Sequence, residues 1–285
     1  VASDITVIAG MADYPAAVVH STFSVDTMGT NPIGTGPFMP DGYEVGVKAA
    51  LIKNESHDWW GLSVGRTVPL DRIEFIDYGT DPSAWIAAAE ADEVDVFYET
   101  VGEYVDIVPG IGWENSTVAS GSTIVVRTNQ VAQDADGNTP YADKRVRQAL
   151  AMAVDNSICL ELGYASKGAP ADNSHAGPMH PEHDPSVGRL PFDPDKAMSL
   201  MKEAGMEDYE HEIMSIDDDW RKNTTDSVAA QLRDAGFKVK RTILPGSTFW
   251  NDWTKYAFSS TNWNHRPFAT QVWGCLLYTS PSPRD

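Results

Sequence analysis

The chain contains few cysteines and few basic residues, and each shortage excludes a class of protein. Cys159 and Cys275 are the two cysteines in 285 residues, which is too few for a fold built on disulfides. The 21 lysines and arginines are outnumbered by 41 acidic residues, for a formal net charge of -20. Nucleic acids and anionic membrane surfaces are bound through patches of lysine and arginine. We therefore expect neither as a partner, and we interpret the acidic residues as a solvated surface.

Long hydrophobic runs are absent as well. No stretch of the sequence approaches the roughly 18 to 20 apolar residues that span a bilayer. The first residues also lack the basic segment and apolar core of a secretion signal. Because the chain starts at Val1 rather than at a methionine, we expect a fragment of a longer product.

What the sequence does contain is an alternation of strand and helix patterns. In the first half, "GYEVGVKAALIKN" and "DRIEFIDYG" alternate apolar and polar residues, as strands and hairpins do. Asp81 as a cap and Pro82 as a first helical residue open an alanine-rich helix, which runs into a predicted short strand, "EVDVFYE". The β-branched run "STIVVRTN" at 122–129 predicts another strand.

The second half continues this alternation with clearer helix signals. Val146, Ala149, Leu150 and Ala153 recur at the spacing of one helix face, behind a cap at Asp143. Further predicted elements are a helix capped by Asp155, a helix from Asp193 to Gly205, the strand "HEIMSI", the helix "DSVAAQLRDAG" and the strand "FKVKRTIL". Strands and helices in this order indicate an α/β architecture.

Six sequence runs, taken in order, are typical of one protein family. They are "IGTGPF" with "NESHDWWG", "LDRIEF", "EVDVF", "DKRVRQALAMAVDNSI", "PFDPDKAMSLMKEAG" and "QLRDAGFKV". On these runs the chain resembles the large, peptide-type solute-binding proteins that deliver ligands to ABC importers, the dipeptide, oligopeptide and nickel binding family. The resemblance extends from about residue 30 to residue 274.

The resemblance implies an incomplete α/β fold of the two-lobed periplasmic-binding-protein type, type II-like and of the large peptide-binding class. In such proteins the ligand is enclosed between lobes that are joined by crossover strands. On this interpretation residues 1–121 are the later part of lobe I, residues 122–274 are lobe II, and the strand at 122–129 is a crossover near the hinge. Residues 275–285, "CLLYTSPSPRD", continue no pattern, and we expect them to be a non-native tail, similar to translated sequencing-adapter read-through.

The stretch "TNWNHRPFAT" falls where, in the resemblance, a lobe II loop returns to the ligand. In the family's peptide binders an aspartate of this loop pairs with the α-amino group of the peptide. Here the loop carries Trp263, Asn264, His265 and Arg266, without an acid. We expect Arg266 or His265 to face an anionic or neutral polar group, since an arginine fork binds a carboxylate through two parallel hydrogen bonds. A rigid indole at Trp263 suits the wall of a solute cleft.

Each of these assignments has a structural alternative. Arg266 could instead pair with a nearby acid and support the loop. Tyr14 and Trp113 are further candidates for lining the cleft, and the alternative for both is an ordinary core position.

Two patterns suggest other chemistry. "GLSVG" matches the nucleophile elbow of serine hydrolases at Ser63, but that elbow must follow a strand and open a helix, and Pro69 soon interrupts any helix. His175, His180 and His183 form a histidine-rich loop that could hold a metal, although their spacing is not a known helical metal motif. The alternative is a polar loop with partly exposed histidines.

The resemblance therefore predicts a non-enzymatic, periplasmic and monomeric binding protein that captures a di- or oligopeptide, or a peptide-like solute. Its partners are the membrane permease and ATPase of an ABC importer, and no cofactor is expected. A metal- or haem-chelate binder of the same fold is the first alternative, and a serine hydrolase is the second.

Overall fold

The computed structural model describes residues 19–27, 32–98, 100–174, 176–186, 190–269 and 271–272. The chain divides into two compact units, Val1–Trp85 and Ile86–Asp285. The lobe boundary that the sequence predicts near residue 121 concerns the complete two-lobed protein and stays a prediction. Every helix in the ranges given above is too short or too polar to cross a membrane.

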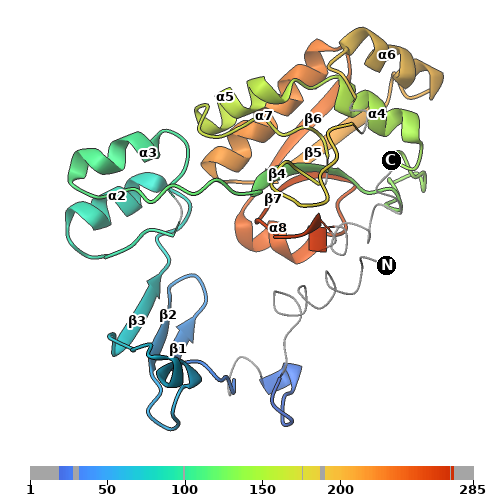
Figure 1. Cartoon of the computed structure of the whole chain (residues 1–285). Coiled ribbons are helices and arrows are strands. Elements are labelled where there is room, and N and C mark those ends of the chain that lie inside the picture. Colours follow the sequence, from blue (N-terminus) through green and yellow to red (C-terminus); the bar gives the residue numbers. More distant parts are fainter. Residues whose placement is uncertain are drawn as a thin grey trace. The chain divides into compact units, whose positions relative to one another are not determined.

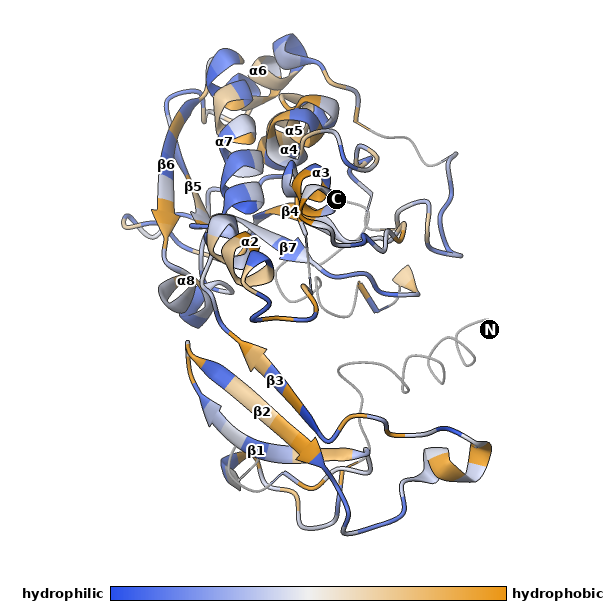
Figure 2. Cartoon of the chain, turned by 90° about the vertical axis from the view of Figure 1, so that its left-hand side faces the viewer, coloured by the Kyte–Doolittle hydropathy of each residue, from blue (hydrophilic) through white to orange (hydrophobic). Residues whose placement is uncertain are grey.

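The first unit is built on an antiparallel sheet with the strand order β1-β2-β3 (Figure 1). These strands are Phe38–Glu44, Lys48–Lys53 and Arg72–Ile76, so the predicted hairpin and the strand after it are confirmed. Short 3-10 helices lie at Val25–Thr27 (η1) and Trp60–Val64 (η2). Figure 2 shows hydrophobic colouring along β2, whose Ala50 is buried.

Helix α2 (Pro82–Glu90) crosses the boundary between the units. The side chain of Asp81 accepts from the backbone N–H of Ser83, as expected of a residue that begins a helix. The short strand predicted at residues 93–99 is wrong, because the described residues there are bends and coil. Val96 and Tyr98 are largely exposed, and the two sheets of the described residues do not include this segment.

The second unit is an α/β layer structure around a four-stranded sheet with the order β4-β7-β5-β6 (Figure 1). The strands are Thr123–Thr128 (β4), Glu210–Ile216 (β5), Lys238–Leu244 (β6) and Phe258–Trp263 (β7). Strand β5 runs parallel to both β6 and β7, whereas β4 runs antiparallel to β7. The three parallel strands therefore end at the same edge of the sheet.

Helices cover both faces of this sheet. Figure 1 shows α4, α5, α6 and α7 on one side and α8 on the other. Their bounds are Lys144–Met152, Asn156–Tyr164, Pro194–Glu203, Asp219–Asp234 and Gly246–Asp252, and α3 (Tyr104–Ile107) with η3 (Val108–Ile111) precedes β4. The main core lies under α4 to α7 and includes Val146, Ala149, Leu232 and Phe258. Burying these side chains is the main driving force for the unit.

Local signals placed three of these helices correctly. The carboxylates of Asp143, Asp155 and Asp193 each accept a backbone N–H of the first turn, at 2.8 to 2.9 Å. A capping bond of this kind stabilises a helix by about 1 kcal/mol. Cys159 is buried in the core, as its apolar surroundings in the sequence predict.

Helix α7 is longer than its hydrophobic pattern predicts. The sequence indicates a helix at residues 226–236, whereas α7 begins at Asp219 behind the cap Asp218. Apart from Trp220, the added residues 219–225 are polar, and only two residues separate them from β5. Their polar side chains reach the edge at which the parallel strands end.

Candidate functional site

The loop after β7 begins at the carboxyl edge of the parallel strands. Strand β5 ends at Ile216 and β7 ends at Trp263, and β4 begins at Thr123, which is the register partner of Trp263. Ligands of open α/β sheets bind beyond the carboxyl ends of the strands, where loops and helix N-termini meet. This edge is therefore the candidate site, and the predicted run from Trp263 to Arg266 starts on it.

Trp263 is half-buried and held from two sides. Its indole Nε1 donates to Thr261 Oγ1 at 3.0 Å, and its ring meets that of Trp253 edge-on, with centroids 6.4 Å apart. Because the indole N–H is already used, what remains for a solute is the apolar ring face. This placement is compatible with the predicted cleft wall, and contact with a solute stays a prediction.

His265 connects the loop to the start of β4. Its Nδ1 accepts from the backbone N–H of Gly121 at 3.0 Å, and its own backbone N–H donates to Ser122 Oγ at 3.0 Å. A side chain on Gly121 would not fit easily, since a Cβ there would lie 3.1 Å from His265 Nδ1. His265 therefore has a clear structural role, in addition to the ligand contact that the sequence predicts for it.

The histidine-rich loop contributes to the same place. The ring of His180 lies nearly parallel to that of His265, with centroids 6.3 Å apart and planes 16° apart. His180 is buried, and within the described ranges neither of its ring nitrogens has a hydrogen-bond partner. The stacking of these two rings joins loops that are distant in sequence, and the spacing of the histidines does not predict it.

The structure describes two of the three histidines of the predicted metal-binding alternative. His183 Nδ1 lies 2.6 Å from the carbonyl oxygen of Ala176, and His175 lies outside the described residues. Among the residues that the structure does describe, no three His, Cys, Asp or Glu side chains are grouped so that they could hold a metal ion. The alternative that includes His175 stays a prediction.

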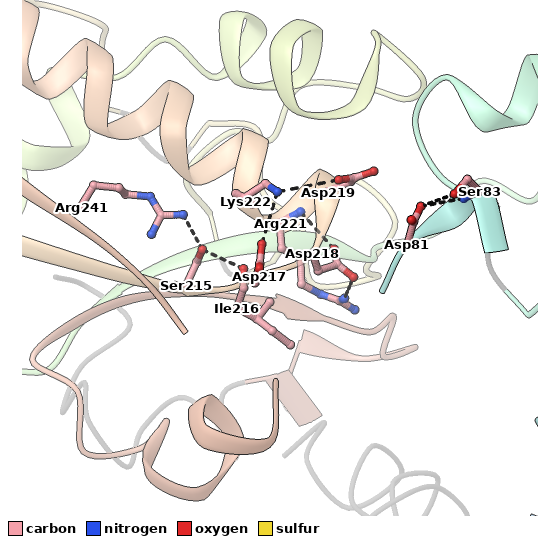
Figure 3. A network of polar contacts seen from close by, with 10 residues as sticks. All are labelled: Asp81, Ser83, Ser215, Ile216, Asp217, Asp218, Asp219, Arg221, Lys222 and Arg241. Atoms are coloured by element: carbon pink, nitrogen blue, oxygen red, sulfur yellow. Dashed lines mark hydrogen bonds and ion pairs between the residues drawn. The ribbon is translucent and has the colours of Figure 1, made fainter. Parts of the chain in front are cut away.

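A polar network that the sequence analysis missed lies at this edge. Arg221, in the first turn of α7, donates from Nη1 to Asp218 Oδ2 at 2.6 Å and from Nε to Asn262 Oδ1 at 2.8 Å. Figure 3 shows the carboxylate of Asp218 and the guanidinium of Arg221 together at the end of β5. The signal that could have revealed it is the run "DDDWR", an acidic cap followed three residues later by an arginine.

Burial controls the electrostatics of this network. Asp218 is 9% exposed, and desolvation raises the pKa of its carboxyl group although the nearby Arg221 charge acts in the opposite direction. The guanidinium of Arg221 also lies over the ring of Trp220, with Cζ 4.8 Å from the ring centroid. The Arg221 side chain is thus fixed by a carboxylate, an amide and an aromatic ring.

Asn264 and Arg266 occupy the loop itself. Asn264 is exposed and accepts through Oδ1 from Asn262 Nδ2 at 3.4 Å, which joins it to the network of Arg221. Arg266 is half-buried and makes a polar or electrostatic contact within the protein. Both side chains carry N–H donors, so this part of the loop favours acceptor groups.

Of the other two predicted lining residues, Trp113 lies in the described part of the chain. Trp113 stacks on Phe97, with ring centroids 4.8 Å apart, in the segment before β4. Tyr14 lies outside the described residues. Their contact with a ligand stays a prediction.

Ser63 does not have the geometry of a nucleophile elbow. It lies in the 3-10 helix η2, and its Oγ donates to the carbonyl oxygen of Trp60 at 2.6 Å. The helix ends at Gly65 with a positive φ of 77°, and coil follows it. The strand-turn-helix arrangement that exposes a serine nucleophile is therefore not formed here.

Comparison with known proteins gives matches over most of the chain. The model of the family described as bacterial extracellular solute-binding proteins, family 5 Middle, matches residues 3–281. Di/tripeptide-binding protein 2 of Pseudomonas aeruginosa is 26% identical over 187 residues, which are 64% of this chain and 32% of that protein. Heme-binding protein A of Haemophilus influenzae is 27% identical over 186 residues, which are 63% of this chain and 30% of that protein.

A solved structure shows the same fold. It is the ABC transporter-associated periplasmic binding protein DppA from Helicobacter pylori in complex with the peptide STSA, which superposes with a TM-score of 0.67 at 18% identity. The superposition covers 89% of this chain and 47% of that one. The predicted fold class is thereby confirmed, and the chain spans about a third to a half of the length of these proteins.

Proposed function

Since the chain belongs to the bacterial extracellular solute-binding proteins of family 5, we propose that it is part of the binding component of an ABC importer. The complete protein acts outside the cytoplasm, as a monomer and without catalysing a reaction. It encloses a di- or oligopeptide, or a peptide-like solute, between two lobes and presents it to a membrane permease and its ATPase. Closure is driven by contacts that both lobes make with the solute at the same time.

The observation that carries this proposal is the position of the loop at 263–266. It follows β7 at the carboxyl edge of the sheet, which is where open α/β folds bind ligands. Trp263 supplies an apolar face, and Asn264 and Arg266 supply donors. The proposal is further supported by similarity to a di/tripeptide-binding protein and to a peptide complex of the same fold.

Arg266 is the residue that we propose reads the polar group of the solute. The family's peptide binders use an aspartate in this loop, and this chain has none between Trp263 and Ala269. An arginine in that place reverses the charge, so a carboxylate or a neutral acceptor replaces the ammonium as the preferred group. The NH₂ group of Asn264 likewise favours an acceptor group of the solute.

The test is a thermal-shift and calorimetric screen of the complete protein against dipeptides, tripeptides, N-acetylated peptides, haem and Ni²⁺. A solute at about 100 times its Kd stabilises the protein by about 2.7 kcal/mol. Arg266→Ala is expected to weaken peptide binding at least tenfold. The matched control is Arg233→Ala, in the last turn of α7 and thus at the end of the helix remote from the site.

Two results would contradict the proposal. Stabilisation by haem or Ni²⁺ without any response to peptides would favour the chelate-binding alternative, for which the similarity to a haem-binding protein and the unpaired nitrogens of His180 are the supporting observations. Hydrolysis of ester or amide substrates by the purified protein would favour an enzyme. Equal affinity of the Arg266 and Arg233 variants would remove Arg266 from the site.

A further inference from the structure

A series of hydrogen bonds connects three polar side chains to Asn264, in the loop at 263–266. Asp218 accepts from Arg221 Nη1 at 2.6 Å, Arg221 Nε donates to Asn262 Oδ1 at 2.8 Å, and Asn262 Nδ2 donates to Asn264 Oδ1 at 3.4 Å. The contacts cross from α7 to β7 and then to the exposed loop after β7. Each contact determines which group of the next side chain donates and which accepts.

The direction follows from the chemistry of arginine. A guanidinium carries donors and no acceptor, so Asn262 must turn its carbonyl oxygen toward Arg221. The amide nitrogen of Asn262 then faces Asn264 and donates to its side-chain carbonyl oxygen. The contact with Asn262 therefore uses the carbonyl oxygen of Asn264 and not its NH₂ group, and Asn264 is an exposed residue.

Burial protects the hydrogen bonds of Asp218 and Arg221 from competition by water. The side chains of Arg221 and Asp218 are 16% and 10% exposed. In such surroundings a charge-assisted hydrogen bond is about twice as strong as a neutral one. The amide of an isolated surface asparagine turns freely, whereas the amide of Asn262 is held by a cation that is itself held by a carboxylate.

We propose that Asp218, Arg221 and Asn262 are positioning residues that make Asn264 a hydrogen-bond donor to the bound solute. This inference rests on the proposed solute-binding function and specifies the chemistry at this loop. The group bound there is an acceptor oxygen of a carboxylate or carbonyl, as in an N-acylated peptide, rather than a free ammonium. A free ammonium would place donors against the donors of Asn264 and Arg266.

Asn262→Asp tests the orientation without touching the ligand. The new carboxylate has the same shape, accepts from Arg221 as before, and has no donor to offer Asn264. Asn264 must then turn its NH₂ group inward, so its carbonyl oxygen faces the solute. If Asn262 had a merely structural role, its replacement would weaken the binding of all ligands equally. We expect the replacement instead to invert the preference between acylated and free peptides.

The measurement is isothermal titration calorimetry of the complete protein with trialanine and N-acetyl-trialanine. We expect the wild-type protein to bind the acetylated peptide at least tenfold tighter, and Asn262→Asp to prefer the free peptide. Asn264→Asp, at an exposed position that does not threaten folding, is expected to show the same inversion. Asn251→Asp on the exposed side of α8 adds the same charge elsewhere and is expected to keep the wild-type preference.

The outcomes separate this inference from the function on which it rests. If the peptides bind and neither variant changes their ratio, or Asn262→Asp weakens both equally, the positioning role is wrong while the binding function stands. If the wild-type protein binds neither peptide, the peptide-binding function is wrong and this inference fails with it.

Discussion

The backbone N–H of Gly121 donates to Nδ1 of His265 at 3.0 Å, across 144 positions of sequence. The backbone N–H of His265 in turn donates to Ser122 Oγ at 3.0 Å. The start of β4 and the loop after β7 are therefore joined through both side chain and main chain. If β4 is a crossover strand, as the resemblance predicts, this contact links the hinge to the binding loop.

Gly121→Ala should disturb this junction. A Cβ at residue 121 would lie 3.1 Å from His265 Nδ1, which is tighter than most Cβ contacts, and 3.6 Å from His180 Cε1, an ordinary contact distance. We expect a loss of about 1–2 kcal/mol in the free energy of unfolding, as for other overpacked sites. Urea denaturation of the complete protein measures it.

Gly110→Ala is the matched control, because a Cβ there meets no atom within 4 Å. It should be neutral or slightly stabilising, since alanine restricts the unfolded chain more than glycine does. Equal stability of both variants would show that the His265 junction tolerates a methyl group.

Replacing Trp263 should separate the ring's role in binding from that of its N–H. The ring contacts Trp253 edge-on and the N–H is used by Thr261. Trp263→Ala is therefore expected to weaken solute binding by about tenfold or more, and Trp263→Phe by much less, because an aromatic face remains. Calorimetric titration with the solute found in the screen, with thermal unfolding as a folding check, would reveal an equal effect of the two variants if the prediction is wrong.

Arg127 is a buried cation, and we expect that it can be replaced with little loss of stability. It is 9% exposed, its Nη2 donates to the carbonyl oxygen of Trp253 at 2.6 Å, and its Cζ lies 4.6 Å from the centroid of the Trp253 ring. No carboxylate of the described residues pairs with it, its Nε has no partner there, and burial lowers the pKa of the guanidinium. Arg127→Met should lie within about 1 kcal/mol of the wild-type stability, or above it.

The matched control is Arg241, another largely buried arginine of the sheet. Its guanidinium binds Asp226 at 2.7 Å and Ser215 at 2.5 Å. Arg241→Met should cost about 2–4 kcal/mol because it leaves polar partners unsatisfied. Urea denaturation measures both variants. A comparable loss of stability for Arg127→Met would mean that Arg127 contributes as much to stability as Arg241 does, and would contradict the prediction.

His211 should make the protein sensitive to acid. It is 1% exposed beside Tyr141 and Phe237, and burial lowers the pKa of its imidazole to about 4. Between pH 6.5 and 4 the unfolded chain binds a proton at this site and the folded protein does not. Stability is therefore complete above pH 6.5 and falls as the pH drops toward 4, by about 3 kcal/mol in total.

The measurement is the free energy of unfolding at pH 7, 5.5 and 4.5 for the wild-type protein and for His211→Phe. Other groups titrate in both proteins, so the difference between them isolates His211. We expect the variant to gain relative to the wild type as the pH falls. A difference that is constant with pH would contradict the assignment.

The sequence by itself determined the parts of this protein that depend on neighbouring residues. Caps such as Asp143 and Asp193 and the apolar spacing of Val146 and Ala149 act within one or two turns of a helix, so α4 and α6 could be predicted from them. The order of strands and helices indicated the α/β class for the same reason. The family runs added a fold and a function that the local patterns do not contain.

The tertiary structure alone decided which distant residues meet. Strand β7 carries Ser259, Ser260 and Thr261, which are polar in sequence yet almost fully buried, because β4 and β5 flank this strand on both sides. No periodicity marks such a strand, and none predicted that His180 stacks on His265 or that Arg221 holds Asn262. These contacts exist because parallel strands end at one edge of a sheet, and that edge collects side chains from segments that are far apart in the chain.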